Sequence, residues 1–343
     1  MSPTRRADRR GPLAQGAWLA SLVAAAACGR DEVLGATGGG GDRIASLGTF
    51  LLVLAAIVFT GVMLVLAWAV LRRRPVRRDD GVDLSEPGTR WVLWGGAVMP
   101  AVVLGAIAVV GMAIMGATPA PRAAPVVTVE VIGHQWWWEL RYTGPTLRGD
   151  VVTANELHLP VGQPVRLLLT STDVIHSFWV PGLNGKLDLI PGDTNDLRLT
   201  AREPGRYTGQ CAEYCGAQHA KMGLLVVAQA PADFQRWWGE QLQPRQPPHD
   251  SLALAGERLF VEGPCAMCHT VRGTGAQGQV APDLTHIGSR AMLGANAIPN
   301  SPGYLAGWIT NAQGIKPGVR MPPITFYDGP ELQALVAYLQ GLK

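Results

Sequence analysis

Two apolar segments without a single charged residue, 44–71 and 91–115, constrain the fold of this 343-residue chain more than any other feature. Each is longer than the roughly 20 residues that a helix needs to cross the hydrocarbon of a bilayer, so both are predicted to be transmembrane helices. The segment between them contains five arginines from Arg72 to Arg78. Short arginine-rich loops stay in the cytoplasm, so everything after residue 116 is predicted to lie outside.

The N-terminus has the pattern of an export signal, with four arginines before residue 11 and an apolar run over 13–27. That run is too short to be a membrane span. The stretch around Cys28 resembles a bacterial lipobox, although Ala25 stands where a lipobox favours leucine; the alternative is an unmodified cysteine in an ordinary signal. We predict a signal peptide over 1–28 and the two membrane helices within 44–116.

The middle of the chain, 125–230, consists of short β-branched or alternating segments separated by proline, glycine and aspartate turns. This pattern predicts a small all-β sandwich or barrel. The segments expected to form strands are 126–132, 156–159, 165–170 and 197–200. A helix over 232–242 and a proline-rich linker over 243–250 are predicted to follow, so that 231–250 connects two domains.

The last part of the chain, 251–343, has helical spacing of apolar residues near its two ends, over 252–261 and 331–339. Segments rich in glycine and proline lie between these two stretches. Two terminal helices that bracket such loops predict a small α domain, wrapped around something other than its own side chains.

Charge and cysteine content narrow the class of protein. The net charge of +3 is small and the later segments mix both signs, so nothing resembles a nucleic-acid-binding face. Four of the five cysteines form two short pairs, Cys211 with Cys215 and Cys265 with Cys268. Pairs with this spacing are typical of metal ligands or of attachment points for a prosthetic group.

Residues 265–269 read Cys-Ala-Met-Cys-His, which is the C-x-x-C-H pattern of c-type haem attachment. One helical turn lets the thiols of Cys265 and Cys268 reach the two vinyl groups of a haem, while the adjacent imidazole of His269 points at the iron. A thioredoxin-like redox pair is the alternative, but the pattern lacks the βαβ setting of that fold. The sequence therefore predicts a covalently bound haem c.

A six-coordinate haem needs a second axial ligand, and Met321 is the predicted one, because the two prolines after it fix the backbone. Met292 is the weaker rival, and a buried core methionine is the alternative for either. A histidine–methionine pair favours electron transfer over oxygen chemistry. The carbonyl of Pro282 is predicted to orient His269, whereas His286 is interpreted as a surface or loop histidine.

A second set of soft donors lies within twelve residues, 211–222, which hold two thiols, an imidazole, a thioether and a carboxylate. Thiolate and thioether together with imidazole select copper over hard cations. Two thiolates can bridge two copper ions, each of which then needs one imidazole. His219 offers one, and His176, after the strand at 165–170, is the candidate for the other. A tetrahedral zinc site and a disulfide between the two cysteines are the alternatives.

From residue 44 to about 240 the chain resembles subunit II of the haem–copper cytochrome c oxidases. The shared features are the two N-terminal spans, the run GHQWWW over 133–138, the upstream His176, and the pattern C-x-E-x-C-x-x-x-H-x-x-M over 211–222. The segment 251–343 is similar to class I cytochromes c over nearly its whole length. The resemblance implies a two-helix transmembrane hairpin, an all-β cupredoxin-like domain and an all-α cytochrome c domain, a fusion typical of the caa3-type branch.

The same resemblance implies the site residues. The ligands of a binuclear copper centre, CuA, would be the side chains of His176, Cys211, Cys215, His219 and Met222 and the backbone carbonyl of Glu213. The carboxylate of Glu213 would reach a magnesium ion at the boundary with subunit I. Trp136 would be the aromatic residue at which electrons enter.

The expected function follows from these implications. A cytochrome c or a bc-type complex would reduce the haem, and electrons would pass to CuA and then to subunit I, which reduces oxygen to water with proton pumping. The chain would lie in the bacterial inner membrane with both metal domains outside. One alternative is a nitric oxide reductase with a similar copper subunit, which assays with oxygen and nitric oxide would separate. The other is a membrane-tethered copper delivery or sensing protein, which would not co-purify with a haem subunit.

Overall fold

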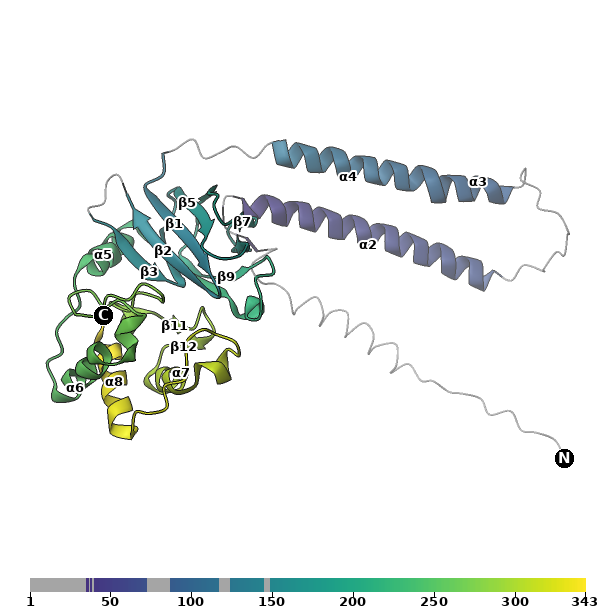
Figure 1. Ribbon diagram of the computed structural model, residues 1–343. Helices are drawn as coiled ribbons and strands as arrows, with labels where there is room; N and C mark the ends of the chain where they lie inside the picture. The colour runs from purple at the N-terminus through teal and green to yellow at the C-terminus, as the bar shows by residue number, and fades with distance from the viewer. Residues whose placement is uncertain (1–34, 37, 39, 73–86, 117–123, 145–148) are drawn as a thin grey trace, which may run out of the picture.

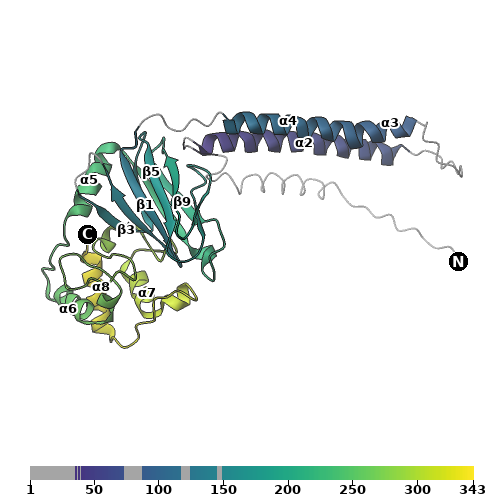
Figure 2. The same ribbon diagram turned by 45° about the horizontal axis from the view of Figure 1, so that its top comes forward.

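The computed structural model describes residues 35–36, 38, 40–72, 87–116, 124–144 and 149–343. The predicted signal peptide, Cys28 and the arginines after Arg72 lie outside the described residues. Two long helices project side by side from a β sandwich, and a helical C-terminal domain packs against the sandwich away from these helices (Figure 1). A view turned by 45° shows the same arrangement (Figure 2).

The two apolar segments form the long helices. The first is α2 (Gly41–Leu71), and the second runs from α3 (Pro87–Leu93) through a π-helical turn (Trp94–Val98) into α4 (Met99–Gly116). Both are long and apolar enough to cross a membrane, and their side chains are mostly exposed. The π turn directly precedes Pro100, which has no amide to donate, so the wider turn is a local adjustment of the helix to this proline.

The β domain is a sandwich of two five-stranded sheets. The first has the order β3-β2-β1-β5-β8, with bounds Val151–Ala154, Trp137–Thr143, Val127–His134, Val165–Ser171 and Asn195–Leu199. The second has the order β4-β10-β9-β6-β7, with bounds Glu156–Pro160, Gly223–Gln229, Gly205–Cys211, His176–Trp179 and Leu187–Leu189. The pairs β1–β5 and β4–β10 are parallel, and the other pairs are antiparallel.

Strict alternation explains why these segments are strands. In β5 the side chains of Val165, Leu167 and Leu169 are buried and those between them are partly exposed, as expected for a strand with one face on a core. The four strands predicted from sequence are confirmed as β1, β4, β5 and β8. The other strands were not predicted, because β6 and β7 are short and several strands lack a clear alternation.

The predicted helix after the sandwich is confirmed as α5 (Pro231–Leu242), which packs Phe234 and Trp238 into the β core. The proline-rich segment after it is fixed to the C-terminal domain. The carbonyl of Gln243 accepts a hydrogen bond from Nε2 of His286 at 3.1 Å. His286 is therefore a loop residue but not a surface residue, because only 3% of it is exposed.

The C-terminal domain consists of three helices and a short hairpin. The helices are α6 (Ser251–Glu262), α7 (Pro302–Ile315) and α8 (Gly329–Gly341), and the hairpin pairs β11 (Met292–Leu293) with β12 (Ile298–Pro299). Asp250 caps α6 by accepting from the amide of Ala253 at 2.8 Å, and Asp328 with Glu331 forms a capping box on α8. The two predicted terminal helices are confirmed, whereas α7 was not predicted.

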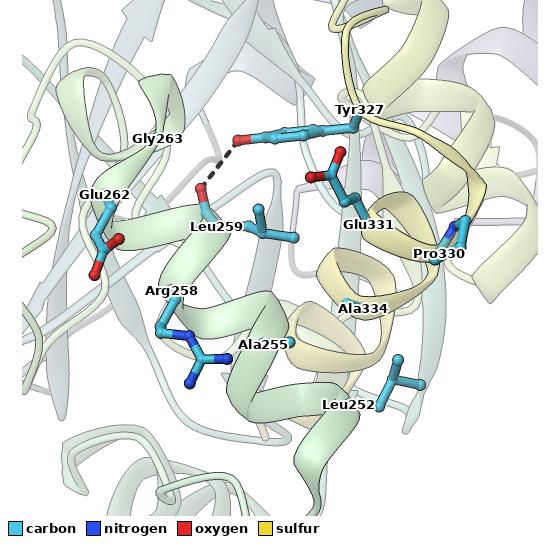
Figure 3. A pocket seen from close by; sticks show the side chains of 10 residues that line it. All are labelled: Leu252, Ala255, Arg258, Leu259, Glu262, Gly263, Tyr327, Pro330, Glu331 and Ala334. Atoms are coloured by element: carbon cyan, nitrogen blue, oxygen red, sulfur yellow. Dashed lines mark hydrogen bonds between the residues drawn. The ribbon is translucent and has the colours of Figure 1, made fainter.

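The first and last helices of this domain cross at a glycine. A Cβ atom on Gly256 of α6 would lie 2.0 Å from the carbonyl oxygen of Ala334 of α8, so the close contact requires glycine. Beside this crossing, the hydroxyl of Tyr327 donates to the carbonyl of Leu259 at 3.0 Å (Figure 3). The open hollow of ≈ 580 Å³ drawn there has none of the predicted ligands among its lining residues.

Candidate metal centre and haem pocket

The fold brings the predicted copper ligands together from two neighbouring strands. His176 is the first residue of β6, Cys211 is the last residue of β9, and the two strands pair in the second sheet. The loop 212–222 then joins β9 to β10, and the amide of Cys211 donates to the carbonyl of Met222 at 2.9 Å. The loop is therefore closed at its base by the sheet itself.

The donor atoms converge inside this loop. The two sulfur atoms of Cys211 and Cys215 lie 3.7 Å apart, and both cysteines are free thiols. Nδ1 of His176 lies 3.9 Å from Sγ of Cys211, while Nδ1 of His219 lies 3.8 Å from Sγ of Cys215. Each thiol thus has one imidazole nitrogen within 4 Å of it.

The remaining predicted ligands complete the set. Sδ of Met222 lies 3.8 Å from Sγ of Cys215, and the carbonyl oxygen of Glu213 lies 3.2 Å from Sγ of Cys211. The side chain of Glu213 is exposed, so its carbonyl faces the sulfur atoms while its carboxylate faces outward. All six predicted residues therefore meet at one place.

Hydrogen bonds orient the predicted histidine ligand His176 and shift the pKa values of the predicted ligands. Nε2 of His176 lies 2.9 Å from the carboxylate of Asp173, which fixes the ring with Nδ1 toward Cys211. Burial works to lower the pKa of His176, but its bonds to Cys211 and Asp173 outweigh burial and raise it. The bond to Cys215, followed by that to His176, lowers the pKa of Cys211 to about 3, and the same pairing raises that of Cys215. The pairing therefore favours a thiolate at Cys211 over one at Cys215.

Trp136 and Gln135 lie in the turn between β1 and β2 and bind the loop 212–222 directly. We call this loop the copper-ligand loop, after its predicted role. The indole N–H of Trp136 donates to the carbonyl of Cys215 at 3.0 Å, and the side-chain amide of Gln135 donates to the same oxygen at 2.8 Å. The backbone amide of Gln135 donates to Asp173 at 2.7 Å. The predicted entry residue is thus one hydrogen bond from a predicted ligand.

In the C-terminal domain, the predicted haem-binding residues line one cavity of ≈ 320 Å³. Cys265 and Cys268 lie at a short turn after α6, and His269 follows them. Nδ1 of His269 bonds the carbonyl of Pro282 at 2.8 Å, as predicted. Burial lowers the pKa of His269, which keeps the imidazole neutral and leaves Nε2 available to a metal.

Both candidate axial methionines, Met321 and Met292, line this cavity. The carbonyl of Met321 accepts from the side chain of Gln313 at 3.1 Å, which fixes the segment that carries it. Met292 belongs to the β11–β12 hairpin. The choice of Met321 over Met292 stays a prediction.

The cavity is also lined by the β domain. His134, Gln135, Trp136 and Trp137 contribute to its wall, together with Ala154 and Asn155. The predicted haem pocket therefore borders the same turn that binds the copper-ligand loop.

Sequence reasoning missed the polar residues that position the ligands and join the domains. Asp173 could have been found, because a carboxylate three residues before a ligand histidine is a common orienting partner. Lys316, which is buried, donates from Nζ to the carbonyls of Trp136 and Gly294 at 3.1 Å each. Glu156 accepts from the amide of Ala291 at 2.9 Å. Nothing local in the sequence marks these two residues as interdomain contacts.

Comparisons with known proteins agree with this architecture. Residues 146–229 match the family model described as cytochrome c oxidase subunit II, periplasmic domain, and residues 253–343 match the model described as cytochrome c. The copper donor set lies within the first match, and the haem-binding residues lie within the second.

Curated relatives match most of the chain or about two thirds of it. The chain is 32% identical over 302 residues to cytochrome c oxidase subunit 2 of Alkalihalophilus pseudofirmus, covering 87% of this chain and 85% of that protein. It is 33% identical to the protein of the same name from Bacillus subtilis, over 65% of this chain and 64% of that one. The solved periplasmic domain of subunit II of cytochrome oxidase from Bradyrhizobium japonicum is 29% identical, over 35% of this chain and 95% of that chain, with a TM-score of 0.32.

Proposed function

Because the chain belongs to the family of cytochrome c oxidase subunit II, we propose that it is the electron-entry subunit of a caa3-type oxidase. In this proposal a haem c in the C-terminal domain accepts electrons from an external donor, and CuA in the β domain delivers them to subunit I, which reduces oxygen to water and pumps protons. One observation carries the proposal. Trp136 lines the predicted haem pocket and also donates a hydrogen bond to Cys215 of the copper-ligand loop.

The donor set fits two copper ions better than one zinc ion. The ligand atoms of His176, Cys211 and Cys215 all lie within 4.8 Å of one another, but His219 is not part of that group. A single tetrahedral ion with bonds of about 2.0–2.3 Å needs all four donors within about 3.8 Å of each other. Two thiols 3.7 Å apart, each with a different imidazole near it, instead suit a pair of copper ions that share the two sulfur atoms. Met222 and the carbonyl of Glu213 then supply the outer ligands.

The C-terminal cavity fits a haem. Its wall is mainly apolar, with Phe260, Leu305 and Leu335 among the lining residues, and it holds both attachment thiols and the neutral His269. Arg290 also lines it, and among the described residues Nε of Arg290 is buried without a hydrogen-bond partner. A buried, incompletely paired guanidinium suits a prosthetic group that carries carboxylates. When bound, the haem and the copper pair supply the one-electron carriers of the chain.

The residues of the chain then have defined tasks. Pro282 orients His269, Asp173 orients His176, and the lowered pKa of Cys211 favours the thiolate that copper requires. Met321 is proposed as the second axial haem ligand. Trp136 provides the contact between the two pockets.

We place the chain in the bacterial inner membrane through α2 and α3–α4, with the β and C-terminal domains on the outer side. The two candidate membrane helices and the match to a periplasmic domain support this placement. The proposed partners are subunit I and the other oxidase subunits, the lipid bilayer, and a cytochrome c or bc-type complex as donor. The outward carboxylate of Glu213 is the proposed contact to a magnesium ion at the boundary with subunit I.

The test is to purify the full complex and determine copper and covalent haem per chain. Two coppers and one haem are expected, together with near-infrared absorbance from CuA and oxygen uptake driven by a reduced cytochrome. Consumption of nitric oxide in place of oxygen would point to the reductase alternative. Cysteine pairs found as cystines, without a haem adduct, would contradict the proposal.

A further inference from the structure

The hairpin of the C-terminal domain, residues 291–299, has an unusual backbone at its tip. Gly294, Ala295 and Asn296 have φ values of +62°, +60° and +63°. Two of these residues are not glycine, and a side chain disfavours this left-handed conformation, so the surroundings must hold it in place. We call this segment the docking hairpin.

The docking hairpin binds the β domain through its backbone. The amide of Ala291 donates to Oε2 of Glu156 in β4 at 2.9 Å, and the carbonyl of Ala295 accepts from the amide of Gly223 in β10 at 3.1 Å. A Cβ atom on Gly223 would lie 2.9 Å from that same carbonyl oxygen, so the close approach requires glycine. The neighbouring strands β4 and β10 thus bind the docking hairpin at its first residue, Ala291, and at its tip, Ala295.

Lys316 adds a second connection between the docking hairpin and the β domain. Its Nζ reaches the carbonyl of Gly294 in the docking hairpin and the carbonyl of Trp136 in the β domain, each at 3.1 Å. The side chain is 1% exposed, so both bonds are shielded from water. One amine therefore ties the hairpin tip, α7 and the Trp136 turn together.

Glu156 is itself held firmly for this role. It is 8% exposed, and its Oε1 bonds Nε2 of His158 at 3.0 Å, while Oε2 receives the amide of Ala291. The buried guanidinium of Arg290, next to Ala291, adds charge attraction to Glu156. Burial of a carboxylate and a guanidinium from different domains is tolerated when they lie opposite each other and have further hydrogen bonds.

The docking hairpin also forms part of the predicted haem pocket, because Met292, Leu293, Gly294 and Ala295 line it. The connecting segment is fixed as well, since the side chain of Arg272 donates to the carbonyl of Gln241 at 2.6 Å and Arg245 pairs with Glu257. Any movement of this domain away from the β domain would therefore open the wall of its own pocket.

We propose that the docking hairpin, Glu156 and Lys316 form a clamp that locks the C-terminal domain onto the β domain in one orientation, so that electrons pass between the domains without a swinging motion. Glu156 and Lys316 are positioning residues in this scheme. The proposal rests on the proposed function only for the electron transfer, since the clamp itself is a statement about docking.

The first test measures docking without reference to activity. Hydrogen–deuterium exchange of the full chain in its complex reports on the amides of Ala291 and Gly223, which donate across the interface. Glu156→Ala leaves the amide of Ala291 without an acceptor and should speed exchange at both positions about tenfold. Glu130→Ala, on a half-exposed carboxylate of the same domain, is the matched control and should change neither. Unchanged protection in Glu156→Ala, with copper and haem spectra intact, would overturn the clamp.

The second test uses the unmodified complex, so it stands even if Glu156→Ala does not fold. The rate at which electrons move from haem to copper is measured in solutions of increasing viscosity. A clamped domain predicts a rate that is independent of viscosity, whereas a rate that falls in proportion to viscosity means a swinging domain and contradicts the clamp. A complex that lacks haem or copper, or in which the haem never reduces the copper, contradicts the proposed function instead. The hydrogen–deuterium exchange of Ala291 and Gly223 then decides by itself whether the clamp exists.

Discussion

The copper-ligand loop and the haem pocket face the same interdomain contact, but the protein holds them in different ways. In the β domain, Cys211, Cys215 and Met222 belong to the same buried core as the strands. Their positions follow from sheet pairing and from hydrogen bonds that the protein makes by itself. We therefore expect the proposed copper donors to keep their positions without a metal.

The C-terminal domain has the opposite design. Its core residues Phe260, Leu305, Ile309 and Leu335 belong to the buried cluster and also line the cavity. Much of this core thus packs around a space that a prosthetic group is expected to fill, and not only against itself. We therefore expect the β domain to keep its proposed site by itself, and the C-terminal domain to depend on a prosthetic group as part of its core.

The largest effect expected from this difference is loss of the C-terminal fold without haem. Replacing both Cys265 and Cys268 by alanine removes the thioether bonds and leaves the mainly apolar cavity of ≈ 320 Å³ without the prosthetic group expected to fill it. Because the free energy of unfolding of a whole domain is only about 5–15 kcal/mol, the loss of this filling should unfold the C-terminal domain. Haem staining on a denaturing gel and exchange protection of α6 and α8 measure the outcome.

The β domain provides the internal control for that experiment. Its core should stay protected in the double cysteine variant, and also after copper is removed with a chelator. Equal loss of protection in both domains would contradict this difference, because it would mean that the two cores fold as one unit.

A smaller effect is expected from the residue that orients a copper ligand. Asp173→Asn weakens the bond that fixes the ring of His176 and should lower copper affinity about 10- to 100-fold. Haem attachment should be unchanged. Asp193→Asn, an exposed aspartate of the same domain, is the matched control. Copper titration of the two variants measures this difference. Equal copper affinities would contradict the expectation that hydrogen bonds of the β domain hold the copper ligands in place.

The comparison also explains what sequence could and could not predict. The proposed copper donors lie within 211–222, apart from His176, and the proposed attachment motif spans five residues, so local pattern alone was enough to predict them. Sheet pairing then places His176 beside Cys211, as expected for an upstream histidine in a β sandwich. Both motifs could be predicted because the type and spacing of residues within a short segment determine which prosthetic group it can bind.

Residues that act across the interface carry no such pattern. Lys316 reads as an ordinary lysine after a helix, yet its amine is buried between two carbonyls of different domains. Glu156 sits at the start of a strand and gives no sign that it accepts an amide from a segment 135 residues later. Likewise His286 is buried because the connecting segment covers it, which only the packed structure reveals.

The pH dependence of stability tests the contact between the two regions. Burial, followed by the nearby positive charge of Lys221, lowers the pKa of Lys316 from 10.5 to about 8, with the Cys215 thiol acting in the opposite direction. Between about pH 8 and 10.5 the unfolded chain holds this proton while the folded chain has released it, so stability rises with pH in that range. Below about pH 8 the amine is charged in both states, so its cost to stability is full and does not change with pH.

The expected gain from pH 7 to 9 is about 1 kcal/mol. Urea unfolding followed by haem absorbance measures it, and Lys316→Met isolates it from other titrating groups, because that variant should lack this part of the rise. Identical pH profiles for the two proteins would mean that the amine does not lose its hydration at the interface.

The smallest effect on stability is expected at the thioether of the copper loop. Met222→Leu conserves volume in the β core and should cost less than about 1.5 kcal/mol. It removes the sulfur that lies 3.8 Å from Cys215, so the potential of the copper centre should shift while haem attachment and the haem potential stay the same. Spectroelectrochemistry resolves the two centres separately. The rigid loop is expected to confine the change to the copper centre. If the copper and haem potentials shifted together, the interdomain contact at Trp136 would be transmitting the change, and the copper loop and the haem pocket would act as one coupled site.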